Sequence, residues 1–227
     1  MNYTYLQLAK MIDHSLLNPV LTDRELEDGC RLARAYDVAS VCIKPYYTKR
    51  CAELLVGSTV AASTVIGFPH GGNLTSIKVA EAKQALDDGG TELDMVVNIG
   101  KVLSEDWAFV QKDIRAVVET THAGGGLVKV IFENCYLQDS HKIRLCEICA
   151  EVGADFVKTS TGYGTGGATH EDLKLMRKHS PPQIKVKAAG GVRTLDNLLE
   201  VRAIGVARSG ATQTAAMLDE CRRRLAA

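Results

Sequence analysis

The sequence lacks the segments that direct a protein to a membrane or out of the cell. No stretch approaches the roughly 18 uninterrupted apolar residues that a membrane-spanning helix needs. The N-terminal segment MNYTYLQLAKMIDHS has no basic flank followed by an apolar run and a small-residue cleavage site. We therefore expect a cytoplasmic protein that makes no membrane contact.

The chain also lacks an excess of charge of either sign. It contains 27 Lys and Arg residues against 27 Asp and Glu residues. A protein that binds nucleic acid or an anionic membrane surface usually carries a basic field over much of its surface. The balance argues against such partners, so an anionic ligand must be met by a local group of residues.

Metal and disulfide sites have little support. Seven cysteines is an odd number, and a chain of this size needs no covalent staples, so we expect reduced thiols. Cys146 and Cys149 form a CxxC pair inside a helical pattern with no second pair. That setting favours packing on a helix face over a zinc or redox site. The six histidines show no HxH or HxxxH spacing of the kind found among zinc ligands.

What the chain does contain is a regular alternation of short apolar runs and helical windows. The expected strands are 11–14, 38–44, 62–68, 92–99, 127–133, 154–160, 183–190 and 206–210. The expected helices are 23–36, 46–56, 75–88, 104–121, 139–152, 170–179, 194–203 and 212–224. The residues expected to start helices are Thr22 with Glu25, Thr75, Ser104, Asp139 and Thr194.

Eight strand–helix units predict a (β/α)8 barrel, because strict alternation implies parallel strands joined by helical crossovers. We expect a single TIM-barrel domain over residues 1–227, with a short N-terminal helix before the barrel. A doubly wound open sheet is the alternative. It is disfavoured because no GxGxxG motif follows the first strand and the glycine clusters fall late in the chain.

Period-two alternation predicts which side chains enter the barrel. The expected inward residues are Glu92, Asp94, Val96, Asn98, Lys129, Ile131, Glu133, Phe156, Lys158, Ser160, Lys185, Lys187 and Ala189. Lys158 and Lys187 come late in their strands, at the end of a barrel where active sites lie. Lys129 and Lys185 come one step earlier, deeper in the barrel, and need carboxylate partners such as Asp94 or Glu133.

Lys158 and Lys187 would thus point into the barrel from neighbouring strands. Burial disfavours the charged form of an amine, and a second ammonium nearby acts in the same direction. The result is a neutral amine that can attack a carbonyl carbon and form a Schiff base. Structural ion pairs that close a polar barrel floor are the alternative, which explains any one of these residues well but the whole set poorly.

Several motifs, in order along residues 11–211, resemble those of the deoxyribose-phosphate aldolase family. They are IDHSLLNP, GFPHG, EAKQALDDGGTELDMVVNIG, KVIFENCYL, FVKTSTGYG and VKAAGGVRT. The resemblance implies a class I aldolase that reversibly cleaves 2-deoxy-D-ribose 5-phosphate to D-glyceraldehyde 3-phosphate and acetaldehyde through a lysine Schiff base. It also implies that no metal or organic cofactor is needed, and that the protein is a homodimer or homotetramer.

The resemblance assigns roles to five residues. Lys158 in FVKTSTG matches the Schiff-base lysine, and Lys187 in VKAAGG matches the second lysine that keeps it deprotonated. Asp94 in ELDMVV matches the acid of the proton relay. Asp13 in IDHS matches an inward aspartate near the substrate hydroxyls. Lys129 in KVIFE matches a lysine beneath the catalytic group, for which a purely structural role is equally open.

A substrate phosphate is expected where the last strands end. Three glycine-rich segments, STGYGTGG, AAGGVRT and RSGAT, offer backbone N–H groups there. Loops after strands seven and eight form the usual phosphate site of this architecture. The expected contacts are Gly162, Gly190, Gly191, Gly210 and Thr212. Arg193 is either a charge partner or a solvated helix start.

Two departures from the family pattern leave the acceptor aldehyde open. The chain reads RSGATQT where serines usually follow the last strand, which introduces the bulkier Gln213. It reads CIKPYY where asparagine usually precedes the proline, so Lys44 adds a cation inside the barrel or at its rim. The alternatives are a class I aldolase with another acceptor and a non-catalytic sugar-phosphate-binding barrel. We interpret His70 in GFPHGG as a turn residue rather than a base.

Overall fold

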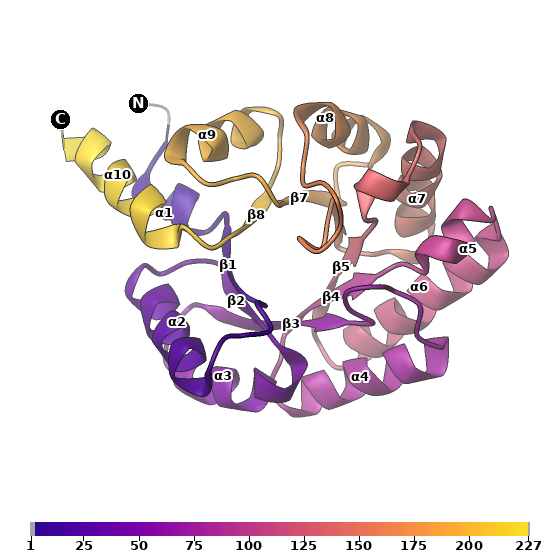
Figure 1. Ribbon diagram of the computed structural model, residues 1–227, viewed down its shortest axis with the longest axis horizontal. Helices are drawn as coiled ribbons and strands as arrows, with labels where there is room; N and C mark the ends of the chain where they lie inside the picture. The colour runs from indigo at the N-terminus through magenta and orange to yellow at the C-terminus, as the bar shows by residue number, and fades with distance from the viewer. Residues whose placement is uncertain (1–2, 227) are drawn as a thin grey trace.

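The computed structural model describes residues 3–226 and contains a closed barrel of eight parallel strands, in the order β1 to β8. Figure 1 shows the helices as an outer ring around the strands. The strands are β1 (Ile12–Leu16), β2 (Ser40–Ile43), β3 (Ala61–Ile66), β4 (Glu92–Val96), β5 (Leu127–Ile131), β6 (Phe156–Lys158), β7 (Lys185–Ala189) and β8 (Arg208–Ala211). The predicted (β/α)8 fold is confirmed. The expected domain also included residues 1, 2 and 227, which lie outside the described residues.

A short helix precedes the barrel, and helices follow the strands. They are α1 (Tyr5–Ala9), α2 (Asp23–Ala35), α3 (Thr48–Leu55), α4 (Thr75–Asp87), α5 (Ile99–Leu103), α6 (Trp107–Ala123), α7 (Asp139–Val152), α8 (His170–His179), α9 (Leu195–Ala203) and α10 (Thr214–Ala226). Short 3-10 turns, η1 (Pro45–Tyr47) and η2 (Asn134–Tyr136), follow β2 and β5. Within residues 3–226, none of the helices is long and apolar enough to cross a membrane.

Local capping explains only some of the helix starts. Thr22 caps α2 and forms the expected capping box with Glu25, and the Thr194 side chain caps α9. The N-cap residues of α4, α6 and α7 are Leu74, Asp106 and Gln138, not the expected Thr75, Ser104 and Asp139. Thr75 instead donates its hydroxyl to Asp113 on α6 at 2.7 Å. A tertiary contact therefore takes up the side chain that the sequence pattern assigned to a cap.

The apolar core lies between the barrel and the helices. Leu93 and Met95 on β4 and Val128 and Val130 on β5 face this layer and are fully buried. Each such side chain stabilises the fold by roughly 1.5–3 kcal/mol. Cys146 and Cys149 on α7 are buried in the same core, so the CxxC pair packs a helix face as predicted.

The strand register decides which interior side chains are neighbours. Lys158 is in register with Lys187, and Lys187 with Arg208, across β6, β7 and β8. Asp94 is in register with Lys129 across β4 and β5. Register partners on parallel strands project to the same face. Three cations thus stand in one row, and carboxylates that neutralise them must reach over from other strands.

Candidate active site

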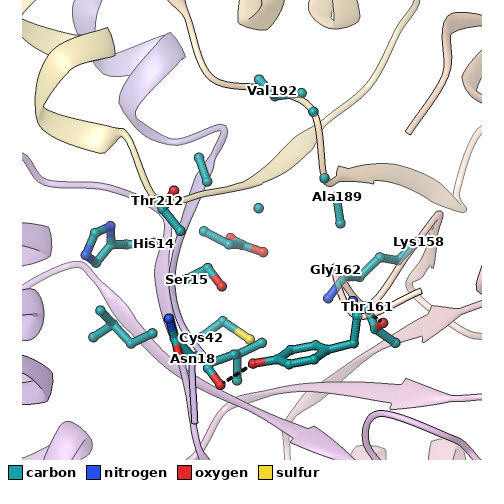
Figure 2. Close-up of a pocket in the computed structure, with 18 of the residues that line it drawn as sticks. His14, Ser15, Asn18, Cys42, Lys158, Thr161, Gly162, Ala189, Val192 and Thr212 are labelled. Atoms are coloured by element: carbon teal, nitrogen blue, oxygen red, sulfur yellow. Dashed lines mark hydrogen bonds between the residues drawn. The ribbon is translucent and has the colours of Figure 1, made fainter. Parts of the chain in front are cut away.

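A cavity of about 620 Å³ opens among the C-terminal ends of the strands (Figure 2). Its wall comes from β1, β2, β6, β7, β8 and the segments that follow them. The site residues expected from the sequence that lie in this wall are Asp13, Lys158, Gly162, Lys187, Gly190, Gly191, Gly210 and Thr212. Asp94 and Lys129 are fully buried and lie outside the wall.

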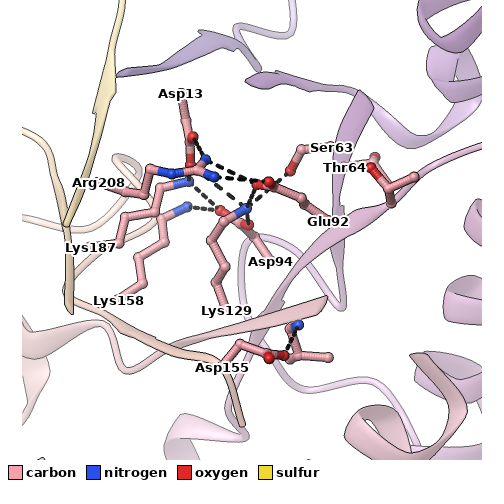
Figure 3. Close-up of polar contacts among 12 residues, drawn as sticks. Asp13, Ser63, Thr64, Glu92, Asp94, Lys129, Asp155, Lys158, Lys187 and Arg208 are labelled. Carbon is pink, nitrogen blue, oxygen red and sulfur yellow. Dashed lines mark hydrogen bonds and ion pairs between the residues drawn. The ribbon is translucent and has the colours of Figure 1, made fainter. Parts of the chain in front are cut away.

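Asp94 is the centre of the buried charges. Its Oδ2 atom accepts a hydrogen bond from Lys158 Nζ at 2.8 Å and one from Lys187 Nζ at 2.7 Å. Its Oδ1 atom accepts from Lys129 Nζ at 2.8 Å. Figure 3 shows the three ammonium groups converging on this carboxylate. Burial alone would raise the pKa of Asp94, but these charges lower it well below the ordinary 3.8, so Asp94 is ionised.

Asp13, Glu92 and Arg208 surround this centre. The guanidinium of Arg208 bridges the two carboxylates, with N···O distances of 2.5 Å to Asp13 and 3.0 Å to Glu92. Asp13 also pairs with Lys187 at 2.5 Å. Glu92 pairs with Lys129 at 2.7 Å. Every charged group of the interior therefore has at least one partner of opposite sign.

Arg208 is the residue of this cluster that sequence reasoning missed. Its signal was present, because Gly210 was placed at the cavity and strand residues two positions apart share a face. Phe156 on β6 supports the guanidinium, with Arg208 Cζ 5.7 Å from the ring centroid. The segment RSGAT therefore carries an interior charge as well as a candidate phosphate contact.

Among residues 3–226, the barrel interior holds one cation more than it has carboxylates. The carboxylates are Asp13, Glu92 and Asp94, and the cations are Lys129, Lys158, Lys187 and Arg208. An unbalanced charge in a low-dielectric interior is unfavourable. Deprotonation of one lysine leaves three cations facing three carboxylates, so the interior favours one neutral amine.

The pKa directions identify Lys158 as that amine. Burial lowers the pKa of Lys158 from its ordinary 10.5, the Lys187 charge acts the same way, and Asp94 only partly opposes them. Burial also favours a neutral Lys187, but Asp13 and Asp94 outweigh it and raise the pKa. The pKa of Lys129 is raised for the same reason, because nearby carboxylates outweigh its burial. Lys158 is the most readily deprotonated lysine of the cluster.

Three residues expected to point into the barrel do not join the buried cluster. Lys185 is exposed at the start of β7, with Nζ 5.5 Å from the Phe156 ring centroid, and so needs no buried carboxylate. Glu133 follows the end of β5, has a left-handed backbone with φ 59°, and binds the loop after β6. Asn98 follows β4 and caps α5. Alternation fails at Glu133 and Asn98 because both strands have already ended.

Three of the four glycines expected to meet a phosphate have a left-handed backbone, whereas Gly210 lies in β8. Gly162, Gly190 and Gly191 have φ values of 90°, 77° and 96°, a region where a side chain would be strained. The wall segment 190–193 leads directly to α9, which begins after Thr194. Backbone N–H groups at a glycine turn and a helix N-terminus favour an anion. This side of the cavity is thus suited to a phosphate.

One departure from the family pattern, RSGATQT, reaches the cavity, and the other, Lys44, lies behind its wall. Thr212 is among the described wall residues, whereas the exposed Gln213 is not. Lys44 donates its Nζ to the Leu21 carbonyl at 2.9 Å and is not a wall residue either. His70 is an exposed turn residue, also outside the described wall. The segment RSGATQT therefore contributes Gly210, Ala211 and Thr212 to the surface that a substrate would meet, whereas Gln213 and Lys44 are not part of that described surface.

The interior carboxylates do not form a metal site. In the part of the chain that the structure describes, no group of three or more His, Cys, Asp and Glu side chains is placed to hold a metal ion. The interior carboxylates are instead occupied by ammonium and guanidinium groups.

Residues 7–213 match the DeoC/LacD family aldolase. The chain belongs to this family. It is an aldolase and therefore a lyase. The deoxyribose-phosphate aldolase of Rhodopirellula baltica is 64% identical over 99% of this chain and 93% of its own length. The deoxyribose-phosphate aldolase of Clostridium perfringens (strain 13 / Type A) is 46% identical over 94% of this chain and 95% of its own length.

Solved structures of aldolases share the barrel. The aldolase QR15 has a TM-score of 0.91 and 35% identity, with 96% of this chain and 97% of that chain covered. The tetrameric deoxyribose phosphate aldolase from Aeropyrum pernix has a TM-score of 0.88 and 29% identity, with 96% and 92% covered. The DeoC/LacD match includes the whole charge cluster, from Asp13 to Arg208.

Proposed function

We propose that the protein reversibly cleaves 2-deoxy-D-ribose 5-phosphate to D-glyceraldehyde 3-phosphate and acetaldehyde, through a Schiff base on Lys158. The observation that carries this proposal is the surplus cation of the barrel interior, which falls on a lysine with a lowered pKa in the cavity wall. A neutral amine that can reach a carbonyl carbon is what Schiff-base formation requires. The names of the relatives in R. baltica and C. perfringens support this choice of substrate.

The proposed reaction begins when the Lys158 Nζ lone pair attacks C1 of the open-chain aldehyde. The carbinolamine loses water and becomes an iminium. Loss of the C3 hydroxyl proton then breaks the C2–C3 bond and releases D-glyceraldehyde 3-phosphate, while the bonding electrons pass to the iminium and form an enamine. Protonation of the enamine at C2 and hydrolysis of the resulting iminium release acetaldehyde and free Lys158.

Asp94 and Lys187 are the proposed partners of this amine. Asp94 accepts directly from Lys158 at 2.8 Å, so the carboxylate is placed to take a proton from Lys158 and return it during dehydration. Lys187 shares the same Oδ2 atom, and its charge lowers the pKa of Lys158. Lys129 on Oδ1 and Asp13 beside Lys187 keep this arrangement in place.

The phosphate is assigned to the glycine turns. Gly162, Gly190 and Gly191 have the backbone geometry for close approach to an anion, and Gly210 and Thr212 complete that side of the wall. The substrate would then extend from Lys158 at one end to these turns at the other. No cofactor takes part in the proposed reaction.

Trapping the imine tests the proposal. The protein is incubated with acetaldehyde and sodium borohydride, and the modified peptide is mapped by mass spectrometry. We expect an added ethyl group on Lys158 and none in Lys158→Arg, whose guanidinium stays protonated. An unlabelled Lys158 in a preparation that cleaves the sugar phosphate would overturn the mechanism.

Cleavage rates separate the remaining alternatives. Faster cleavage of another sugar phosphate than of 2-deoxy-D-ribose 5-phosphate would favour an aldolase with a different acceptor. Ligand binding without turnover and without a trapped imine would favour a non-catalytic barrel.

We further propose that the protein is cytoplasmic and forms a homodimer or homotetramer. The A. pernix structure is described as tetrameric, and the seven free thiols suit a reducing compartment. Light scattering over a range of protein concentrations tests the oligomeric state.

A further inference from the structure

Tyr163, in the loop after β6, spans the mouth of the barrel. Its hydroxyl donates to the Leu17 carbonyl, beyond the end of β1, at 2.7 Å, and Figure 2 draws this bond as a dashed line. β1 and β6 are not neighbours, because β7 and β8 stand between them in the barrel. The Tyr163 ring also packs edge-on against Phe68, after β3, with the centroids 5.5 Å apart. One side chain thus connects its own loop to loops from two other parts of the barrel.

The backbone beneath this ring is anchored on its other side. The Thr161 backbone N–H donates to the Glu133 carboxylate at 3.1 Å, and the Thr161 hydroxyl binds the same carboxylate. The Tyr163 backbone N–H in turn donates to Thr161 Oγ1 at 2.9 Å. Glu133 is 2% exposed, so the anchor is shielded from water. The loop holds Tyr163 in place before any ligand arrives.

The cavity is built on one half of the barrel mouth. Its described wall takes residues from the ends of β1, β2, β6, β7 and β8, and none from the ends of β3, β4 and β5. Tyr163, Leu17 and Asn18 are wall residues, while Phe68 is not. The tyrosine therefore stands between the cavity and the loop after β3, in contact with both sides.

The position of the Tyr163 ring determines which acceptor aldehydes it can admit or exclude. In the proposed reaction the acceptor carbons lie between the Lys158 amine and the glycine turns, and Tyr163 is a wall residue of the same cavity. The turn at 190–191 offers only backbone groups. These groups can bind a phosphate, but they do not limit how wide the carbon chain of a substrate can be. Tyr163 is 46% exposed, but its ring is fixed at two points, by the contact with Phe68 and by the hydroxyl bond to Leu17. An aromatic ring fixed in this way is a rigid boundary.

We propose that Tyr163 is a specificity-determining residue, whose tethered ring limits the width of the acceptor aldehyde. This inference rests on the proposed aldolase function. The hydroxyl bond to Leu17 and the contact with Phe68 hold the ring in place, and the ring excludes branched or aromatic acceptors.

Two variants distinguish the contribution of the Tyr163 ring from that of its hydroxyl bond to Leu17. Tyr163→Ala removes the boundary, and Tyr163→Phe removes only the hydroxyl while the Phe68 contact keeps the ring in place. The measurement is kcat/KM for the addition of acetaldehyde to isobutyraldehyde, divided by kcat/KM for addition to D-glyceraldehyde 3-phosphate. We expect Tyr163→Ala to raise this ratio about tenfold or more, the effect of reshaping an apolar pocket. Tyr163→Phe should leave the ratio within about twofold of the unaltered protein.

An unchanged ratio in Tyr163→Ala overturns the inference, and so does a rise in Tyr163→Phe equal to that in Tyr163→Ala. If Tyr163→Ala fails to fold, Tyr163→Leu gives the same comparison with a smaller side chain that retains apolar packing. The borohydride trap at Lys158 is run on each variant. A missing trap in the unaltered protein contradicts the proposed function, whereas an intact trap with an unchanged ratio contradicts only the role of Tyr163.

Discussion

Lys78 and Lys158 are both buried and each donates to a buried aspartate, yet of the two only Lys158 lines the cavity. Lys78 on α4 reaches Asp113 on α6 at 2.6 Å, outside the barrel, and Lys158 reaches Asp94 at 2.8 Å inside it. Burial lowers the pKa of both lysines. A perturbed lysine with a carboxylate partner is therefore not by itself a sign of an active site.

The difference lies in what else each pair contacts. Lys78 also donates to the Val96 carbonyl at 2.9 Å and is 0% exposed, so it joins α4, α6 and the end of β4. Lys158 shares its carboxylate with Lys187 and lines an open cavity. Competition for one carboxylate, together with access to a ligand, distinguishes a reactive amine from a structural one.

Loss of the Lys158 amine should have the largest effect on activity. Lys158→Met removes the nucleophile and should lower kcat for cleavage by about 10⁴-fold or more. It also removes a buried amine whose charged form the folded interior disfavours, so the free energy of unfolding should be maintained or increased. Stopped assays with purified protein and urea unfolding measure the two quantities. Retained activity would assign the nucleophile to another group.

Loss of the Lys78 ammonium should lower stability and leave activity almost unchanged, the opposite of what we expect for Lys158. Lys78→Met leaves the Asp113 carboxylate buried without its cation, so unfolding should become easier by about 3–5 kcal/mol. At a temperature where the variant is still folded, kcat should stay within about threefold of the unaltered protein, because Lys78 lies outside the cavity.

The double variant Lys78→Met with Asp113→Leu is the matched control. It removes both charges, so it should regain most of the lost stability. If the double variant were as unstable as the single one, packing rather than the unpaired charge would explain the loss.

Removal of the second barrel lysine should move the pH dependence of the reaction. The Lys187 charge lowers the pKa of Lys158 and competes for Asp94. In Lys187→Met both influences disappear, so the pKa of Lys158 rises and the ascending limb of kcat/KM moves to higher pH. A pH–rate profile measures this shift. A limb that stays in place or moves to lower pH contradicts the role of Lys187.

The smallest expected effect is a change in how the free energy of unfolding depends on pH. The folded pKa of Lys158 lies below its ordinary 10.5, so between these two values the unfolded chain binds more protons than the folded one. The free energy of unfolding contributed by Lys158 therefore rises with pH through that window. Urea unfolding at several alkaline pH values should show a weaker rise in Lys158→Met, and an identical slope would contradict the lowered pKa.

The local pattern of the sequence carried much of the architecture. The alternating apolar runs predicted all eight strands, and period two turned Asp94, Lys129, Lys158 and Lys187 toward the interior, where the structure has them. Alternation reports a face but not a depth, which is why Lys185 was expected in the buried floor although it is exposed. It also reports nothing beyond the end of a strand, as Glu133 illustrates.

Contacts between distant segments were outside the reach of pattern reasoning. Tyr163 and Leu17 are 146 residues apart, and Arg208 and Asp13 are 195 apart. Lys78 has an ordinary place in a helical pattern, and its burial follows only from how α4 packs on α6. The functional meaning of such residues depends on partners that the local sequence does not name.

The sequence by itself determined the order of strands and helices and the inward direction of Glu92, Asp94, Lys129, Lys158 and Lys187, because both follow from local periodicity. Only the tertiary structure decided that Lys129, Lys158 and Lys187 meet on one carboxylate and that four interior cations face three carboxylates. The physical reason is closure of the barrel. Register and closure bring β4 into contact with side chains from β6 and β7, strands that are not its neighbours in the sheet.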